Sequence, residues 1–428
     1  IGCLFRKGLA ASSMRHWLKN NDYSTLLKNY SSLSLVQLSN YILPLMTLPY
    51  LARTLGATNF GLVIMAQATM IYLTLITDYG FGLSATKNIA KNQKNIEKIS
   101  EIFSTVMSIK IGLLLVGFLI LHGLITFIPV FKAHQVLFYS SFLIVIGNTF
   151  LPGFLFQGLE KMTFIAIFNL FAKLGFTGLI FLMINTPTDY QWVHAIWGCS
   201  YIMVDAVAFL IIFSRFKIKI KRPNLSNIQA TLNHSFEYFL SRIAIAIYLN
   251  TNVILVGILL STENAGYYGG AEKLLFAITT FYAPLIETIY PYISRTKNIP
   301  FIKKILAATT SLNTIGCIAA FFLAPLIVPL ILGTTFKPAT ELFQWMLIIA
   351  LLHLPASMIG YPVLGALGYE KTANRSVIIG AITHLLLLII CYPSITQPLH
   401  FIWIMIASQF IIFMIRVIKL LQIQRQHH

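Results

Sequence analysis

Residues 103–128 read FSTVMSIKIGLLLVGFLILHGLITFI, and this stretch decides the class of fold. As a helix it is long enough to cross a hydrocarbon layer about 30 Å thick, because each helical residue rises about 1.5 Å. Only helices and closed barrels pair every backbone group within lipid, and the stretch lacks the alternating pattern of a barrel strand. We therefore interpret it as a transmembrane helix.

Similar apolar runs recur along the whole chain, and they predict about twelve spans. Of the 428 residues, 57% are hydrophobic and only 10% are charged, whereas soluble domains carry about 25% charged residues. A soluble protein of this size could not cover its surface with so few charges. The predicted spans are 31–52, 60–83, 103–128, 135–157, 163–184, 192–213, 236–260, 265–293, 305–332, 340–366, 375–394 and 399–421.

The positions of Lys and Arg predict the orientation of the chain. With the N-terminus placed in the cytoplasm, 24 of the 31 Lys and Arg fall in inside segments, and only Arg53, Lys132 and Lys337 lie outside. Cytoplasmic loops of membrane proteins carry this excess of positive charge. We therefore expect both termini in the cytoplasm, and we attribute the net charge of +18 to the membrane and not to nucleic acid.

Two short motifs occur twice. LGATNFG at 55–61 returns as LSTENAG at 260–266, with Leu, Asn and Gly at the same spacing. The pattern P-x5-G-x-E-K begins at Pro152 and again at Pro362. We expect the Asn and Gly of the first motif to form a tight turn, and the Gly of the second to cap a helix end. The nearly equal offsets predict a duplicated chain.

The duplication predicts an all-α integral membrane protein with two six-helix bundles related by a pseudo-twofold axis around a central cavity. The N-terminal bundle would comprise 31–213 and the C-terminal bundle 236–421, with a basic cytoplasmic loop at 214–235 between them. A cytoplasmic N-terminal segment, 1–30, and a tail, 422–428, would flank the bundles. We expect Met14 to be the native start, with the residues before it an upstream extension.

Ionisable side chains inside the spans are the candidate functional residues, because each costs about 2.5–3.5 kcal/mol to insert. Lys and Arg suit a phosphate-bearing headgroup. The candidate cavity cations are Lys173, Arg242, Lys273 and Lys110. The candidates for ion coupling or charge pairing are Asp78, Glu272, Glu287 and Asp205.

Each of these assignments has an alternative. We favour the cavity for Lys173 and Arg242, and snorkelling to the membrane surface for Lys110. His353 and His384 also fall within spans. For both we favour a hydrogen-bonded histidine of the bundle over a proton relay. The four cysteines are scattered, so we expect no metal site, no disulfide framework and no cofactor.

The opening of the chain resembles the Wzx-type oligosaccharide flippases, in the polysaccharide transporter family of the multidrug/oligosaccharidyl-lipid/polysaccharide (MOP) exporter superfamily. The residues that carry the resemblance are NYSSL at 29–33, PYLARTLG at 49–56, Phe60-Gly61 and DYGFG at 78–82. Later helices match by pattern and not by residues. The resemblance implies a protein of the bacterial inner membrane that carries an undecaprenyl-diphosphate-linked oligosaccharide, such as an O-antigen unit, to the periplasmic leaflet. Its implied partners are membrane lipids, a polysaccharide polymerase and the chain-length machinery.

Two other classes of function are weighed against the flippase. A drug or cation antiporter of the same superfamily would need an acidic, aromatic cavity, whereas the spans here contain Lys and Arg. A membrane-embedded polymerase or glycosyltransferase would need a large external loop or an acidic loop motif, and the outside loops are short. The sequence shows neither a nucleotide-binding loop nor a metal cluster, so we expect no enzyme and no ATP-driven pump.

Overall fold

The computed structural model describes the backbone of residues 21–280, 282–297 and 299–426, and these residues form helices and turns without any strand. The elements of the first half are α2 (Asn21–Asp78), α3 (Phe81–Lys91), α4 (Ile96–Phe127), α5 (Pro129–Ala133), α6 (Gln135–Phe150), α7 (Gly153–Gly158), α8 (Met162–Met183), η1 (Pro187–Trp192) and α9 (Val193–Ser214). Those of the second half are α10 (Leu225–Leu259), α11 (Thr262–Thr280), α12 (Ala283–Thr296), α13 (Ile299–Leu332), η2 (Thr334–Phe336), α14 (Ala339–Met358), η3 (Ile359–Gly365), α15 (Glu370–Cys391), η4 (Tyr392–Ser394) and α16 (Pro398–Gln426).

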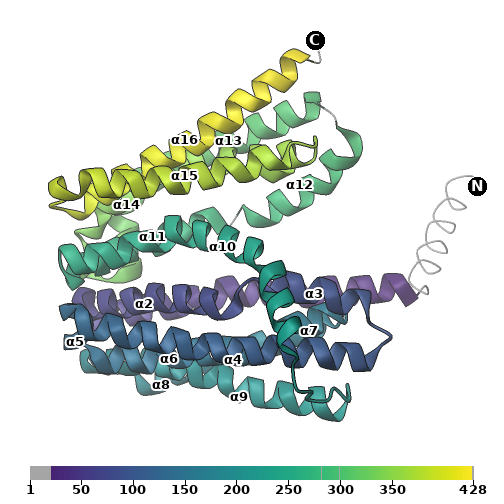
Figure 1. The fold of residues 1–428 in the computed structure, drawn as a ribbon. Coiled ribbons are helices and arrows are strands. Elements are labelled where there is room, and N and C mark those ends of the chain that lie inside the picture. Colours follow the sequence, from purple (N-terminus) through teal and green to yellow (C-terminus); the bar gives the residue numbers. More distant parts are fainter. Residues whose placement is uncertain (1–20, 281, 298, 427–428) are drawn as a thin grey trace, which may run out of the picture.

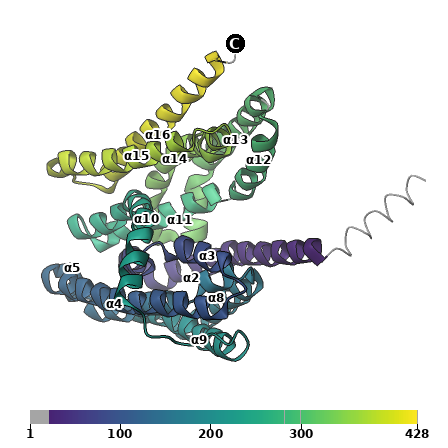
Figure 2. The same cartoon turned by 45° about the vertical axis from the view of Figure 1, so that its right-hand side comes forward.

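The helices form two groups that follow the two halves of the sequence (Figure 1). The helices from α2 to α9 make up one group, and those from α11 to α16 make up the other. Helix α10 begins beside the first group and crosses to the second, as both views show (Figure 2). Helix α10, which the prediction assigned from residue 236 to the C-terminal bundle, therefore contacts both groups.

Glycine and proline break the long helices at defined places. Helix α2 is interrupted at Gly56, whose φ of 71° lies in the left-handed region that favours glycine. The turn expected from the Asn and Gly of LGATNFG is therefore confirmed for Gly56, but it is wrong for Asn59 and Gly61, which are helical. The side chain of Asn59 instead donates a hydrogen bond of 2.9 Å to the carbonyl oxygen of Pro187.

The second repeated motif also breaks a helix in each half. Pro152 stands between α6 and α7, and Pro362 lies in η3 directly after α14. Each short element then ends with a backbone hydrogen bond that spans five residues, from Lys161 to Phe156 and from Tyr369 to Leu364.

The left-handed residue of this turn differs between the two copies. It is Gly368, as expected, in the second copy, but Glu160 in the first. The expectation that Gly158 caps a helix is therefore wrong. Gly158 is needed for packing, because a Cβ there would lie 2.7 Å from Cβ of Ile89 on α3.

The number of spans and two boundaries differ from the prediction. By length and composition, nine described helices could cross a membrane, or ten if the bent α10 counts as one span. One of the nine, Leu43–Lys91, runs through the break at Gly56 and through the predicted second span. The count of twelve therefore stays a prediction.

Three segments that were expected to be a loop or terminal segments are partly helical. Helix α10 begins at Leu225, so the second part of the predicted loop 214–235 is helical. Helix α16 continues to Gln426, into the predicted tail. Residues 21–30 of the predicted N-terminal segment belong to α2, while Met14 lies outside the described residues.

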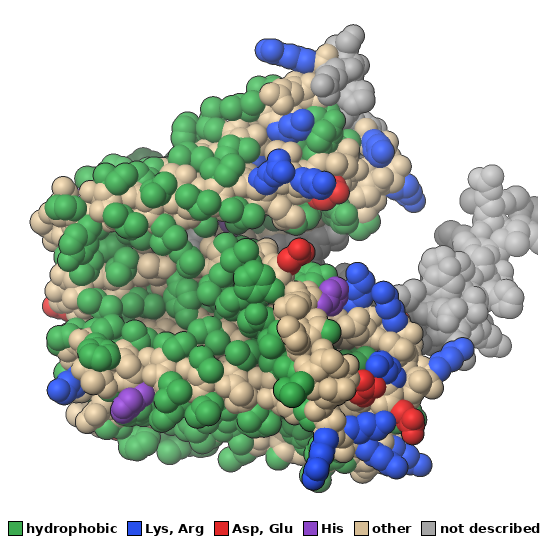
Figure 3. Space-filling view, in the orientation of Figure 1, with side chains coloured by type: hydrophobic (Ala, Val, Ile, Leu, Met, Phe, Trp, Pro, Cys, Tyr) green, Lys and Arg blue, Asp and Glu red, His purple; other side chains and the backbone are tan. Residues whose placement is uncertain are grey.

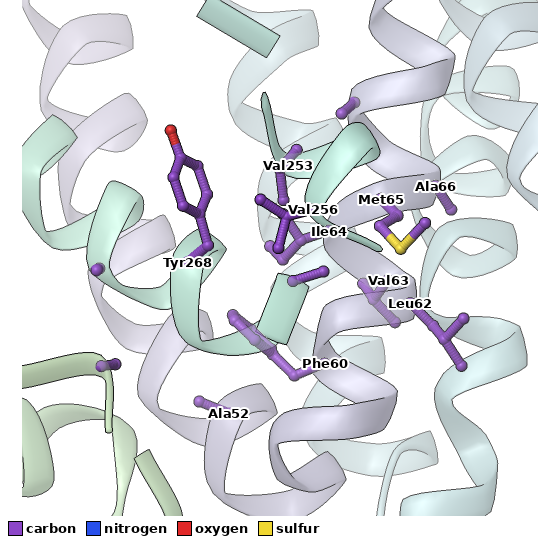
Figure 4. Close-up of a cluster of buried hydrophobic side chains, with 14 of the residues drawn as sticks. Ala52, Phe60, Leu62, Val63, Ile64, Met65, Ala66, Val253, Val256 and Tyr268 are labelled. Atoms are coloured by element: carbon purple, nitrogen blue, oxygen red, sulfur yellow. The ribbon is translucent and has the colours of Figure 1, made fainter. Parts of the chain in front are cut away.

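The buried apolar residues show how the two halves are joined. One core runs through both halves and includes Phe60 and Met65 of α2, Val253 of α10 and Tyr268 of α11 (Figure 4). This core lies toward the end of the molecule that holds the Gly56 break and the turn between α10 and α11, which we call the turn end.

The opposite end has two separate cores. One contains Phe103 and Phe156 of the first half, and the other contains Ile293 and Leu364 of the second. Lys and Arg side chains gather at this end, which we call the basic end, and the molecule is hollowed there between the halves (Figure 3). The halves therefore meet at the turn end and separate at the basic end.

Candidate functional site

The surface between the halves is formed mainly by α2, α10 and α11. At the turn end, Gly61 and Gly266 let the backbones of α2 and α11 approach closely. A methyl group on Gly61 would overlap the carbonyl oxygen of Thr262, and one on Gly266 would overlap that of Ala57. The ring of Phe336 packs edge-on against Phe60 with centroids 5.5 Å apart. No water-sized passage is compatible with such contacts, so the turn end is closed along this line.

The middle of this surface is polar. Lys273 on α11 donates a hydrogen bond of 2.9 Å from Nζ to Oε1 of Gln67 on α2. Tyr72 of α2 lies 2.6 Å from the hydroxyl of Thr251 on α10 and donates to the carbonyl oxygen of Ala246 at 3.1 Å. Such bonds satisfy polar groups that would be costly within a membrane.

Glu272 and Lys273 are neighbours on α11 and both are half-buried. Successive helical residues point about 100° apart, so only one of them can face Gln67 directly. The structure assigns that position to Lys273. Glu287 belongs to α12, but its side chain lies outside the described residues.

Toward the basic end, the first part of α10 packs on the first half of the chain. Arg242 Nη1 forms a salt bridge with the Oδ2 of Asp78, at the end of α2. Ser235 and Ser84 hydroxyls lie 2.7 Å apart, and the ring of Phe239 stacks on that of Tyr79. Arg242 is therefore paired with an acid, which is the charge pairing that was one of the two roles expected for Asp78.

Helix α10 changes partners along its length. Its two parts, Leu225–Ile247 and Leu249–Leu259, meet at a bend of 48°. The first part bonds to Ser84 of α3 and Glu101 of α4, and the second bonds to Tyr268 of α11 and His384 of α15. Helix α10 is thus the element that joins the two halves along the opening at the basic end.

Lys110 and Asp205 are buried inside the first half and not on the surface between the halves. Each is 3% exposed. Nζ of Lys110 lies 5.9 Å from the ring centroid of Phe154, and Asp78 and Asp205 are the acids that act on it electrostatically. Snorkelling, which the sequence favoured for Lys110, is therefore wrong, because this side chain does not reach the surface.

The carboxylate of Asp205 has an unusual environment. Neither of its oxygens has a hydrogen-bond partner among the described residues. Lys110 on α4 is its electrostatic partner, but the two groups do not form a salt bridge within 4 Å. A carboxyl group and an amino group are thus both buried in the first half without a direct salt bridge.

Lys173 is half-buried on α8. This helix packs against α2, α7 and α9, all of the first half. Lys173 has neither an ion pair nor a hydrogen bond to a described residue. The structure therefore does not bring Lys173 and Arg242 together, and Lys173 keeps an ammonium group without an acidic neighbour.

Arg416 was missed as a special residue, because the sequence analysis counted it among the cytoplasmic cations. It is 7% exposed and donates to Oγ of Ser376 at 2.8 Å and to the carbonyl oxygens of Ala356 and Ala373 at 2.6 and 3.3 Å. Its guanidinium also fills the space beside Gly360, where α14 is broken. Its position within the predicted span 399–421 was the signal that could have revealed it.

Metal binding is not indicated in the described part of the chain. It contains no group of three or more His, Cys, Asp or Glu side chains that could hold an ion. Cys199, Cys317 and Cys391 are free thiols.

These features define the class of protein. An all-helical membrane protein whose repeated halves meet at one end and separate at the other has the construction of an alternating-access transporter. The chain shares its fold with a MATE family multidrug transporter of the MOP superfamily in an inward-facing conformation, with a TM-score of 0.63 and 12% identity over 90% of this chain and 99% of that one. It also shares it with the lipid II flippase MurJ in an inward closed conformation, with a TM-score of 0.64 and 17% identity over 92% of this chain and 87% of that one.

The sequence comparison gives the family. Residues 26–297 match the family described as polysaccharide biosynthesis protein, and the chain belongs to this family. A relative from Escherichia coli (strain K12), named "Putative O-antigen transporter", is 29% identical over 375 residues, which are 86% of this chain and 90% of that protein. The chain is therefore an all-helical membrane protein of the polysaccharide biosynthesis family, and it shares its fold with the MATE and MurJ transporters.

Proposed function

We propose that the protein is a flippase for a lipid-linked oligosaccharide. The substrate would be an O-antigen or other surface-polysaccharide repeat unit attached to undecaprenyl diphosphate. It would move from the cytoplasmic to the periplasmic leaflet of a bacterial inner membrane. Family membership and the likeness to an O-antigen transporter support this substrate class.

The observation that carries the mechanism is the arrangement of the three cores. A single core joins the halves at the turn end, while each half keeps its own core at the basic end. Relative rotation of two rigid halves can exchange the open and closed ends, which is alternating access. If the basic end faces the cytoplasm, as the positions of Lys and Arg predict, the structure is inward-facing. An inward-facing state is the one that receives a substrate made in the cytoplasm.

The charges between the halves suit a diphosphate headgroup. Lys273 and Arg242 lie on the two helices of the second half that face α2, and each already bonds to a polar group of the first half. A diphosphate that enters between the halves would replace Gln67 and Asp78 as their partner. Lys173 would provide a third cation on the first half. The lipid tail would stay in the bilayer while the headgroup passes between the halves.

Deletion and complementation of the gene test this function. We expect the deletion strain to lose surface polysaccharide and to accumulate the lipid-linked unit on the cytoplasmic leaflet, and the intact gene to reverse both effects. Accumulation on the periplasmic leaflet would instead indicate a step after transfer across the membrane. Normal polysaccharide with increased sensitivity to cationic drugs would favour the antiporter.

A further inference from the structure

A buried polar cluster lies in the second half of the chain. Its centre is His384 on α15, which is 0% exposed. Asn252 on α10, Tyr268 on α11 and Ser408 on α16 complete the cluster, and each of these is exposed by 1% or less. Four helices therefore contribute to one site inside the membrane, and a buried polar group there is expensive unless it is hydrogen-bonded.

Both ring nitrogens of His384 face groups that can accept a hydrogen bond. Nε2 lies 2.9 Å from Oδ1 of Asn252, and Nδ1 lies 3.3 Å from Oγ of Ser408. The hydroxyl of Ser408 makes its shorter bond, 2.8 Å, to the carbonyl oxygen of Ile404, which can only accept. The hydroxyl oxygen of Ser408 can then only accept a hydrogen bond from Nδ1 of His384. A ring that donates from both nitrogens is an imidazolium, so this arrangement fits the protonated histidine.

The neutral ring can be accommodated by turning a single amide. In the arrangement described, Nδ2 of Asn252 donates to the hydroxyl of Tyr268 at 3.0 Å. If the amide of Asn252 turns by 180°, its nitrogen donates to Nε2 of His384 and its oxygen accepts from Tyr268. The oxygen and nitrogen of an amide have nearly the same shape, so the exchange needs no change in packing. The cluster thus satisfies either protonation state of His384.

We propose that His384 is a proton-binding site of this transporter, with Asn252 as the group that adapts to the proton. Uptake of a proton by the ring reverses the role of the Tyr268 hydroxyl from donor to acceptor. The sequence analysis favoured a hydrogen-bonded histidine for this position, and the geometry shows that hydrogen bonding and proton binding are compatible here.

The cluster is placed where a proton can influence the contact between the halves. The ring of Tyr268 belongs to the core that joins the two halves at the turn end (Figure 4). Asn252 follows the bend of α10 within about one helical turn. The charged and histidine residues on the helices of the cluster are His234, Glu237 and Arg242 on α10, Glu263, Glu272 and Lys273 on α11, Glu370, Lys371 and Arg375 on α15, and His400, Arg416, Lys419 and Arg425 on α16, while the neighbouring α14 carries Glu341 and His353. The contacts through which the cluster would hold the proton are those of the ring with Asn252 and Ser408.

Proton binding itself can be tested independently of any substrate. We would record nitrogen spectra of the ¹⁵N-histidine-labelled full chain in lipid bilayers, from about pH 8 to about pH 5. The signal that disappears in His384→Gln belongs to His384, and His353→Gln is the matched control. We expect the His384 signal to change from the neutral to the imidazolium form. In Asn252→Asp, the adjacent carboxylate should make proton binding at least about tenfold tighter.

The outcomes decide the proposal. A His384 signal that keeps one form over the whole range, or an unchanged titration in Asn252→Asp, overturns it. If His384→Gln fails to reach the membrane, the signal whose titration moves in Asn252→Asp is the His384 signal, because the new carboxylate lies next to that ring. The behaviour of the same signal in the wild-type protein then decides the proposal.

Coupling of this proton to transport rests on the proposed function and needs a second experiment. Cells treated with nigericin to abolish the pH gradient should lose most surface polysaccharide with the wild-type protein. Cells with His384→Gln should show a lower level that nigericin does not reduce further. Continued sensitivity of His384→Gln to nigericin would overturn the coupling, while failure of the flippase assignment would leave the titration result unaffected.

Discussion

Gly61 and Gly266, 205 positions apart in the sequence, pack reciprocally against each other's helix. Gly61 of α2 lies against the backbone of Thr262, and Gly266 of α11 lies against that of Ala57. Thr262 and Ala57 occupy matching places in the two copies of the repeated motif. A contact in which each partner uses the same residues is the signature of a twofold axis. The reciprocal contact is therefore what the predicted pseudo-twofold axis between the halves would produce.

The reciprocal contact predicts that a side chain at either glycine blocks closure of the turn end. Overpacking costs about 1–3 kcal/mol, and about 1.4 kcal/mol corresponds to a tenfold change in an equilibrium. We expect Gly61→Val and Gly266→Val to reduce surface polysaccharide about tenfold or more at normal protein level. Gly123→Ala on α4 is the control, because nothing lies within 4 Å of a Cβ there. Full activity of both valine variants would show that the turn end need not close this tightly.

The pair of Asp78 and Arg242 predicts a charge-reversal rescue. Asp78→Asn and Arg242→Gln should each lower the surface-polysaccharide level, because the first part of α10 loses its charged attachment to α2. The double variant Asp78→Arg with Arg242→Asp should recover part of the activity. Lys98→Gln provides the control, since it removes an exposed pair with Glu101 that is worth at most about 1 kcal/mol. Activity of both single variants equal to wild type would remove the pair from the mechanism.

At position 173 we expect transport to depend on the positive charge of the side chain and not on its shape. We expect Lys173→Gln to reduce surface polysaccharide while the amount of protein in the membrane stays normal. Lys173→Arg should retain more activity, because it keeps the cation. Lys132→Gln, at an exposed cation near the turn end, should have no effect. A Gln variant at position 173 that works as well as wild type would exclude this residue from the substrate path.

We expect replacement of Arg416 to lower the stability of the protein. Replacement by Met leaves the carbonyl oxygens of Ala356 and Ala373 without their charged donor beside the break of α14. A hydrogen bond to a charged group contributes about 1.5–3 kcal/mol. We expect a clearly lower unfolding temperature of the purified protein, with Arg416→Lys in between. The exposed Arg425, changed to Gln, should leave the temperature unchanged, and an equally stable Met variant would contradict this role.

The orientation of the chain predicts the result of reporter fusions. Fusions after residues 90, 220, 300 and 372 should read cytoplasmic, because these positions lie in the segments rich in Lys and Arg. Fusions at 187, 262 and 397 should read periplasmic. A periplasmic signal at 220 would reverse the assignment of the basic end to the cytoplasm.

The sequence by itself determined that the chain is a helical membrane protein, and its repeated motifs predict a duplication. Apolar runs such as 103–128 must be helical in lipid, because no water is present to satisfy an open backbone. The repeated motifs marked Gly61 and Gly266 as equivalent before their contact was visible. The resemblance of the opening residues identified the transporter family, which the comparisons confirm.

Only the tertiary structure decided which residues meet. Asp78 and Arg242 are 164 positions apart, and their pairing depends on how α2 and α10 cross. A change in the rotation of one helix by a single residue, about 100°, would point each side chain elsewhere. The same holds for the buried Lys110, for Arg416 and for the cluster around His384. Apolar periodicity indicates which face of a helix is buried, but it does not indicate which helix covers that face. Many apolar surfaces can pack against one another, whereas each polar side chain needs a particular partner.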